Sequence, residues 1–194
     1  MQVTRTLRYR GFKWRAMANL VFGRQAAALA LFDEMLHEFP GDAYALASIA
    51  HLQGQGGDRN AALRTMDRLL QLHPNEGSHW FNHGYLLEEA GEYERAEAAF
   101  RRATELSPQL DRAWYGLGLV LIRLQRLDEA VAALKRNTQL QPMSPYGWYQ
   151  LARVHVDRQE PEEARRIIRH LQRFEPKVAA QLVRETGLSV EPAR

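Results

Sequence analysis

The feature that most constrains this chain is a constant spacing of 34 residues between successive prolines. The series is Pro40, Pro74, Pro108, Pro142 and Pro176. Tryptophans and alanines keep the same phase, at Trp80, Trp114, Trp148 and at Ala28, Ala62, Ala96, Ala130, Ala164. Such a period is typical of repeat proteins, in which each unit packs mainly on its neighbours. The sequence therefore predicts tandem units at residues 9–42, 43–76, 77–110, 111–144 and 145–178.

Each unit contains two helical patterns. In the unit 111–144, apolar residues recur at intervals of three and four, which places them along one stripe of each helix. The two stripes must therefore face each other, so the two helices of a unit pack together. The phased proline ends the second helix, because it lacks an N–H and disfavours a helical residue before it.

The pattern resembles the tetratricopeptide repeat family over residues 9–178. Its marks are a large apolar residue at unit position 4, a small residue at 8, alanine at 20, a bulky apolar residue at 24 and proline at 32. The resemblance implies an all-α, right-handed superhelical solenoid of antiparallel helix pairs. Positions 11 and 27 depart from the family pattern. The first two units match the pattern less well than units three and four, and we expect them to be less stable than those units.

The two ends lie outside the repeats. Residues 1–8 are predicted to form a basic N-terminal extension. After Pro176, the apolar stripe of Val178, Leu182 and Val183 predicts a capping helix over 179–187, which Gly187 ends. Residues 188–194 are expected to be a disordered tail.

The resemblance also implies that the first helix of each unit lines a concave binding groove. The candidate groove residues are Phe81, Asn82, Tyr85, Arg112, Tyr115, Leu119, Ile122, Arg123, Tyr146, Tyr149 and Arg153. Tyrosine and arginine often carry the binding energy of protein interfaces. The leading hypothesis is a non-enzymatic protein–protein interaction module, an adaptor, assembly factor or chaperone, that binds a peptide or helix of a partner protein. In the other interpretation, each aromatic residue only covers a seam between helices.

The sequence disfavours three more specific kinds of site: a carboxylate clamp, a metal site and a phosphate loop. Some relatives clamp a partner's C-terminal carboxylate; Asn82 and Arg112 match two such positions, but the other positions are lost. His79 and His83 have a spacing that metal ligands use, yet no glutamate follows the first histidine and a packing role is favoured. We expect no catalytic residue, no cofactor and no metal. The glycine-rich stretch 54–57 follows a helix, so it predicts a turn at Gly57 and a notch in the groove rather than a phosphate loop.

Composition indicates the cellular compartment. The chain has no cysteine, which excludes disulfides and thiolate sites and favours a reducing compartment. No apolar run approaches the roughly 18 residues of a membrane span, so we expect a cytoplasmic protein.

The formal net charge is +3, but residues 1–24 contain only basic charges. This segment is predicted to be a helix that packs its apolar face inward; nucleic acid is not expected as a partner. The alternative is a self-assembling structural subunit, a homo-oligomer, or a peripheral scaffold on an anionic membrane.

Overall fold

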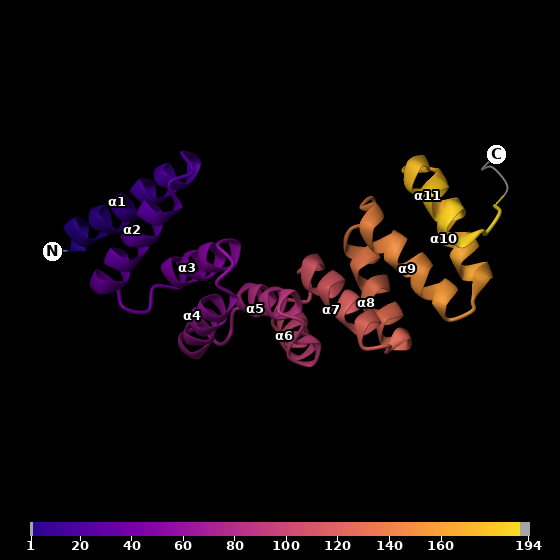
Figure 1. Cartoon of the computed structure of the whole chain (residues 1–194), viewed down its shortest axis with the longest axis horizontal. Helices are drawn as coiled ribbons and strands as arrows, with labels where there is room; N and C mark the ends of the chain where they lie inside the picture. The colour runs from indigo at the N-terminus through magenta and orange to yellow at the C-terminus, as the bar shows by residue number, and fades with distance from the viewer. Residues whose placement is uncertain (1, 191–194) are drawn as a thin grey trace.

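The computed structural model describes residues 2–190, and the side chains of residues 5–190. This part of the chain contains eleven α-helices and no strand. Their bounds are α1 Gln2–Val21, α2 Gln25–Glu38, α3 Ala43–Gln55, α4 Arg59–Leu72, α5 Gly77–Glu89, α6 Tyr93–Leu106, α7 Asp111–Arg123, α8 Leu127–Leu140, α9 Pro145–Asp157, α10 Pro161–Gln172 and α11 Pro176–Thr186. Helices α1 to α10 form successive pairs, and α11 packs against α9 and α10. The result is an arched solenoid with its termini at opposite ends (Figure 1).

The repeat phase sets where most helices begin and end. Helices α3, α5, α7 and α9 each have 13 residues and start at the first position of a unit. Asp42 and Asp58 cap two N-termini, because their side chains accept hydrogen bonds from backbone amides inside α3 and α4. The first four phased prolines each follow the end of a second helix, as their missing N–H requires.

The turn inside each unit needs one residue in the left-handed region. The φ angles at this position are 69° at Gly23, 87° at Gly57, 78° at Gly91, 59° at Gln125 and 61° at Gln159. Glycine adopts this conformation without a steric cost, whereas glutamine does not. The glycine-rich stretch of the second unit is therefore a helix-to-helix turn.

The tryptophans tie each of the last three units to the proline turn before it. The indole Nε1 atoms of Trp80, Trp114 and Trp148 donate to the carbonyls of Pro74, Pro108 and Pro142, at 2.7, 3.0 and 2.9 Å. Position 4 thus supplies a hydrogen bond as well as apolar volume. The first two units have Phe12 and Leu46 there, which cannot donate.

Both ends differ from the predicted boundaries. No proline interrupts residues 2–21, and α1 runs through the predicted extension as one continuous helix. Helix α11 begins at Pro176 rather than at 179, because proline fits the first turn of a helix, and it ends at Gly187 in the left-handed conformation. Leu188 and Val190 pack against the C-terminal core, so residues 188–190 are not a free tail. Residues 191–194 of the predicted tail lie outside the described residues.

Candidate functional site

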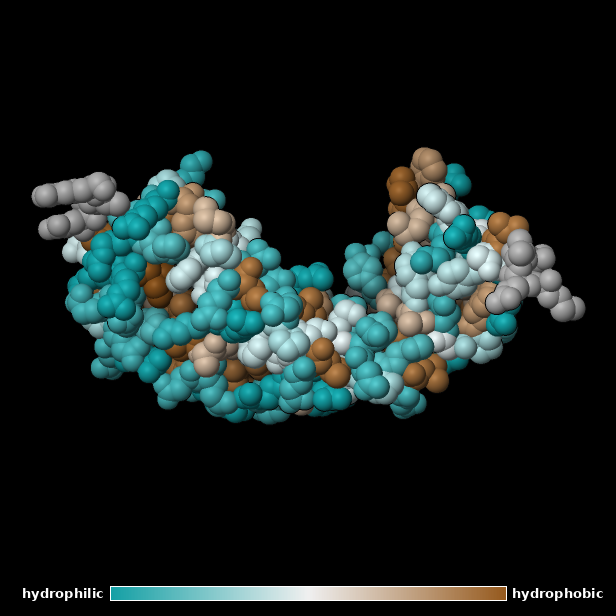
Figure 2. All heavy atoms as spheres, turned by 180° about the vertical axis from the view of Figure 1, so that it is seen from behind, coloured by the Kyte–Doolittle hydropathy of each residue, from teal (hydrophilic) through white to brown (hydrophobic). Residues whose placement is uncertain are grey.

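The concave side of the solenoid is lined by the first helices of the units. In Figure 1, α3 and α5 lie on the inner side of the arch and α4 and α6 on the outer side. The space-filling view shows two limbs with a broad hollow between them (Figure 2). Three pockets follow one another along α3, α5, α7, α9 and α11, and we name them the first, central and last pockets.

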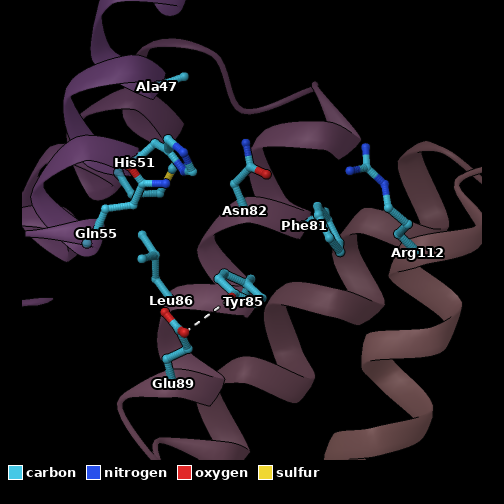
Figure 3. A pocket seen from close by; sticks show the side chains of 11 residues that line it. Ala47, His51, Gln55, Phe81, Asn82, Tyr85, Leu86, Glu89 and Arg112 are labelled. Atoms are coloured by element: carbon cyan, nitrogen blue, oxygen red, sulfur yellow. Dashed lines mark hydrogen bonds between the residues drawn. The ribbon is translucent and has the colours of Figure 1, made fainter. Parts of the chain in front are cut away.

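The first pocket has a volume of about 590 Å³ and lies between α3 and α5. In Figure 3, His51 and Gln55 form one wall, Asn82 and Tyr85 face them from α5, and Arg112 closes the far end. The notch predicted at Gly54 belongs to this pocket. Besides leaving out a side chain, the glycine has a packing role between two helices. A Cβ at Gly54 would lie 3.0 Å from the Cδ2 of Leu86, so glycine allows α3 and α5 to approach closely.

The central pocket, of about 420 Å³, lies between α5 and α7 and shares Phe81, Tyr85 and Arg112 with the first. The guanidinium carbon of Arg112 lies 5.0 Å from the centre of the Phe81 ring, a cation–π geometry that holds the arginine over the aromatic surface. Phe81 in turn packs on the buried ring of Phe100, with 6.0 Å between centroids. The two pockets are therefore continuous across a rigid aromatic ridge.

Charges of both signs face the central pocket. Burial raises the pKa of Glu88, and the nearby Arg123 only partly opposes this effect. The hydroxyl of Tyr85 donates to Glu89 at 3.0 Å, which raises the pKa of the tyrosine. Burial likewise raises the pKa of Tyr115. The tyrosines are neutral near pH 7, so the charges available to a ligand are those of the carboxylates and arginines.

The last pocket, of about 460 Å³, is formed by α7, α9 and α11, and it shares Tyr115 with the central pocket. The hydroxyl of Tyr149 donates to the Glu185 carboxylate of α11 at 2.5 Å, which lowers the pKa of the glutamate. Arg153 stacks beside Tyr149, with its guanidinium carbon 5.8 Å from the ring centre. Tyr146 is 70% exposed at the rim of the pocket.

The structure brings most of the predicted groove residues together. The ones that line a pocket are Phe81, Asn82, Tyr85, Arg112, Tyr115, Leu119, Arg123, Tyr146 and Tyr149. Two predicted residues line none of these pockets: Arg153, which stacks beside Tyr149, and Ile122, which is half-buried and packs against two core clusters.

Two parts of the lining were missed. Ala47, His51 and Gln55 occupy in the second unit the same repeat positions that identified the groove residues of the later units, so those positions could have found them. Val178 and Gln181 of α11 also line the last pocket. No repeat position predicts them, because α11 starts out of phase.

Of the paired histidines, His83 is buried and His79 is half-buried. His83 is 7% exposed, and its Nε2 atom lies 3.3 Å from the Asp67 carboxylate on α4. Burial lowers the pKa of His83 despite that carboxylate, and it also lowers the pKa of His79. Within residues 2–190, no group of three or more His, Cys, Asp or Glu side chains is placed to hold a metal ion.

The comparisons with known proteins decide the family. Models of the tetratricopeptide repeat match residues 48–111, 87–149 and 145–170. The chain belongs to the tetratricopeptide repeat family. The fold is accordingly a solenoid of that family, whose members typically serve as non-enzymatic protein–protein interaction modules.

Solved structures agree on the fold of this tetratricopeptide repeat protein. MamA 41-end from Desulfovibrio magneticus RS-1 is 20% identical, with a TM-score of 0.76 over 91% of this chain and 96% of that one. YrrB, described as a TPR protein with an unusual peptide-binding site, is 19% identical, with a TM-score of 0.74 over 87% and 88%. A tetratricopeptide repeat protein from Parabacteroides merdae ATCC 43184 is 20% identical, with a TM-score of 0.79 over 92% and 73%. No curated protein matches the chain in sequence.

Among the described helices of this repeat protein, none is long and apolar enough to cross a bilayer. A cytoplasmic location stays a prediction of the sequence.

Proposed function

We propose that this protein is a non-enzymatic adaptor, assembly factor or chaperone whose concave groove holds a peptide or helix of a partner protein. The observation that carries the proposal is the continuity of the three pockets through shared aromatic residues. Tyr85 and Tyr146 are 49% and 70% exposed, so packing between helices leaves much of each ring accessible to a ligand. YrrB, a protein of similar fold, is described as having an unusual peptide-binding site, which supports a peptide as the kind of ligand.

The spacing of the pockets suggests the length of the bound segment. The first helices of successive units lie at least one packed-helix distance of about 10 Å apart, so the three steps from α3 to α9 span roughly 30 Å or more. An extended chain advances about 3.3 Å per residue, and about nine residues cover that span. Arg112, Arg123, Glu88 and Glu89 line the central pocket, so the segment should carry charges of both signs around apolar anchors.

The structure changes which variants test the groove. The sequence argument predicts that Tyr115→Ala with Tyr149→Ala removes binding without loss of stability. Both rings pack against the C-terminal core, and Tyr149 bonds to Glu185, so that double variant perturbs folding as well. The exposed pair Tyr85 and Tyr146 is the cleaner choice.

A displayed library of random peptides, selected on the wild-type protein, supplies the probe. The tightest peptide, labelled for fluorescence anisotropy, should bind the Tyr85→Ala, Tyr146→Ala variant at least about thirtyfold more weakly, since the loss of even one hot-spot aromatic costs about 2 kcal/mol. Met143→Ala is the matched control, because Met143 is 68% exposed and lies outside the three pockets. Equal affinity for the groove variant and the wild type would refute the groove as the binding site.

A further inference from the structure

Helix α1 has two apolar faces. Its inner face, which includes Phe12, Ala16 and Leu20, packs in the N-terminal core as the sequence predicts. Its outer face carries Leu7, Trp14 and Val21 at intervals of seven residues, two helical turns apart. These side chains are 62%, 76% and 78% exposed, and the neighbouring Met17 and Phe22 are 45% and 74% exposed. We call these five residues the outer face of α1.

The two ends of the solenoid contrast in chemistry. The terminal units of repeat proteins usually present a polar outer side, which keeps the array soluble. Helix α11 follows this rule, since Lys177 and Arg184 are exposed on it in addition to Gln181 and Glu185 beside the last pocket. The space-filling view shows brown side chains at the upper end of the N-terminal limb, on the right (Figure 2). A concentrated exposed apolar surface of this kind marks a binding site.

Basic side chains border the outer face on both sides. Arg10 precedes Met17 by seven residues and shares its flank, whereas Arg8 and Arg15 share the opposite flank. All three arginines are exposed, but Arg8 forms an ion pair with Glu38 of α2 at 3.0 Å, so Arg10 and Arg15 are the border cations that face outward. The first acidic residue of the chain is Asp33, so α1 carries no negative charge. An apolar stripe between two basic borders is the pattern of a helix that lies in a membrane interface.

We propose that the outer face of α1 docks on an anionic lipid bilayer. Trp14 and its apolar neighbours enter the boundary between headgroups and acyl chains, where tryptophan is enriched. Arg10 and Arg15 reach the lipid phosphates, since long basic side chains extend toward the polar layer.

The shape and charge of the face favour a membrane over other occupants. A second copy in two-fold pairing would bring the arginine borders of both molecules together, and like charges oppose that contact. A partner helix usually binds in a groove, whereas these side chains stand on the outside of a single helix. None of them lines the three groove pockets, so lipid docking leaves the groove open.

Co-sedimentation of the full chain with vesicles tests the proposal. The vesicles are phosphatidylcholine alone, or phosphatidylcholine with about a third phosphatidylserine. The wild type should pellet with the anionic vesicles only. Arg10→Gln with Arg15→Gln should weaken binding about thirtyfold, because each cation near such a surface contributes about fivefold. Trp14→Gln with Val21→Gln should weaken it at least about tenfold; these sites are exposed, so folding is retained.

A matched control and a direct readout complete the experiment. Met143→Gln with Arg169→Gln replaces one apolar and one basic residue at exposed positions far along the chain and should leave binding unchanged. Brominated lipid should quench a fluorescence component that the Trp14→Phe variant lacks. Failure to pellet, or equal pelleting of all variants, would overturn the proposal. So would a dimer in vesicle-free solution that Trp14→Gln abolishes, or binding of an acidic helical peptide to α1 without any affinity for vesicles.

Discussion

The turn position with positive φ permits a sharp test of how the units are stabilised. Gln125 and Gln159 hold the conformation that glycine holds in the first three units, at φ 59° and 61°. We predict that Gln125→Gly and Gln159→Gly stabilise the protein. Replacing glutamine by glycine normally weakens a structured segment, so a gain would identify backbone conformation as the cause.

The size of the gain follows from two opposing contributions. The left-handed conformation costs a non-glycine residue about 1–2 kcal/mol, and glycine loses about 0.4–1 kcal/mol more through its freer unfolded chain. The net gain is about 0.5–1 kcal/mol at each site. Gln125 also donates a hydrogen bond from Nε2 to the carbonyl of Ile122 at 3.3 Å, so the gain should be smaller there than at Gln159.

The reverse change should have the opposite sign. A Cβ at Gly91 would meet no atom within 4 Å, so Gly91→Gln introduces conformational cost without a clash. We expect a loss of about 1 kcal/mol.

Urea unfolding followed by circular dichroism, with hydrogen exchange of the turn amides, measures these effects in a repeat array that can unfold unit by unit. Gln139→Gly is the control, because Gln139 is exposed inside α8 and the change should cost about 1 kcal/mol. The reasoning is refuted if Gln159→Gly destabilises the protein as Gln139→Gly does.

Three further predictions concern the core and the groove. Trp114→Phe removes the indole hydrogen bond and should cost about 1 kcal/mol; Trp114→Ala should cost about 3 kcal/mol, because the ring is half-buried rather than enclosed. Glu88→Gln should raise the melting temperature at pH 7. Burial raises the pKa of Glu88, so stability falls as the pH rises through that pKa, and the advantage of glutamine should vanish below about pH 4. Gly116→Ala should cost about 1–3 kcal/mol, since its Cβ would lie 2.6 Å from the buried Phe100 ring.

Each of these has an outcome that contradicts it. Trp114→Phe with wild-type stability would mean that the proline carbonyl finds water equally well. A gain for Glu88→Gln that persists unchanged in acid would show that charge burial is not its source. A neutral Gly116→Ala would show that Phe100 moves freely.

The sequence predicts the repeated part of the fold because one period fixes several properties together. The phase of the prolines and small residues determines the start of α3, α5, α7 and α9 and the positions that face the concave side. It also places Tyr85 and Arg112 beside the same pocket, although they lie in different units. In a repeat protein, equivalent positions of successive units lie close together, so a pattern in the sequence predicts which residues are neighbours in space.

The 34-residue period does not extend to α11, and it does not determine the direction of every side chain within a unit. Helix α11 starts out of phase, so Gln181 could not be assigned to the groove. Ile122 occupies a groove position, but the path of its side chain depends on the angle between units, and it turns into the core. For α1 the sequence leaves two interpretations open, an inward-packed helix and a membrane-bound one, because its packing decides which of its apolar residues stay exposed.

The floor of the groove and the core of the repeats share one ring. Phe100 is 1% exposed, yet it lines the central pocket, and it lies so close to Gly84 and Gly116 that a Cβ at either would be 2.9 or 2.6 Å from the ring. The small residues that let α5 and α7 close over Phe100 therefore also set the depth of that pocket. Because a packed core resists small displacements, the spacing of the two helices is held without a ligand. The central pocket should accordingly be formed before a partner binds, which lowers the entropic cost of binding.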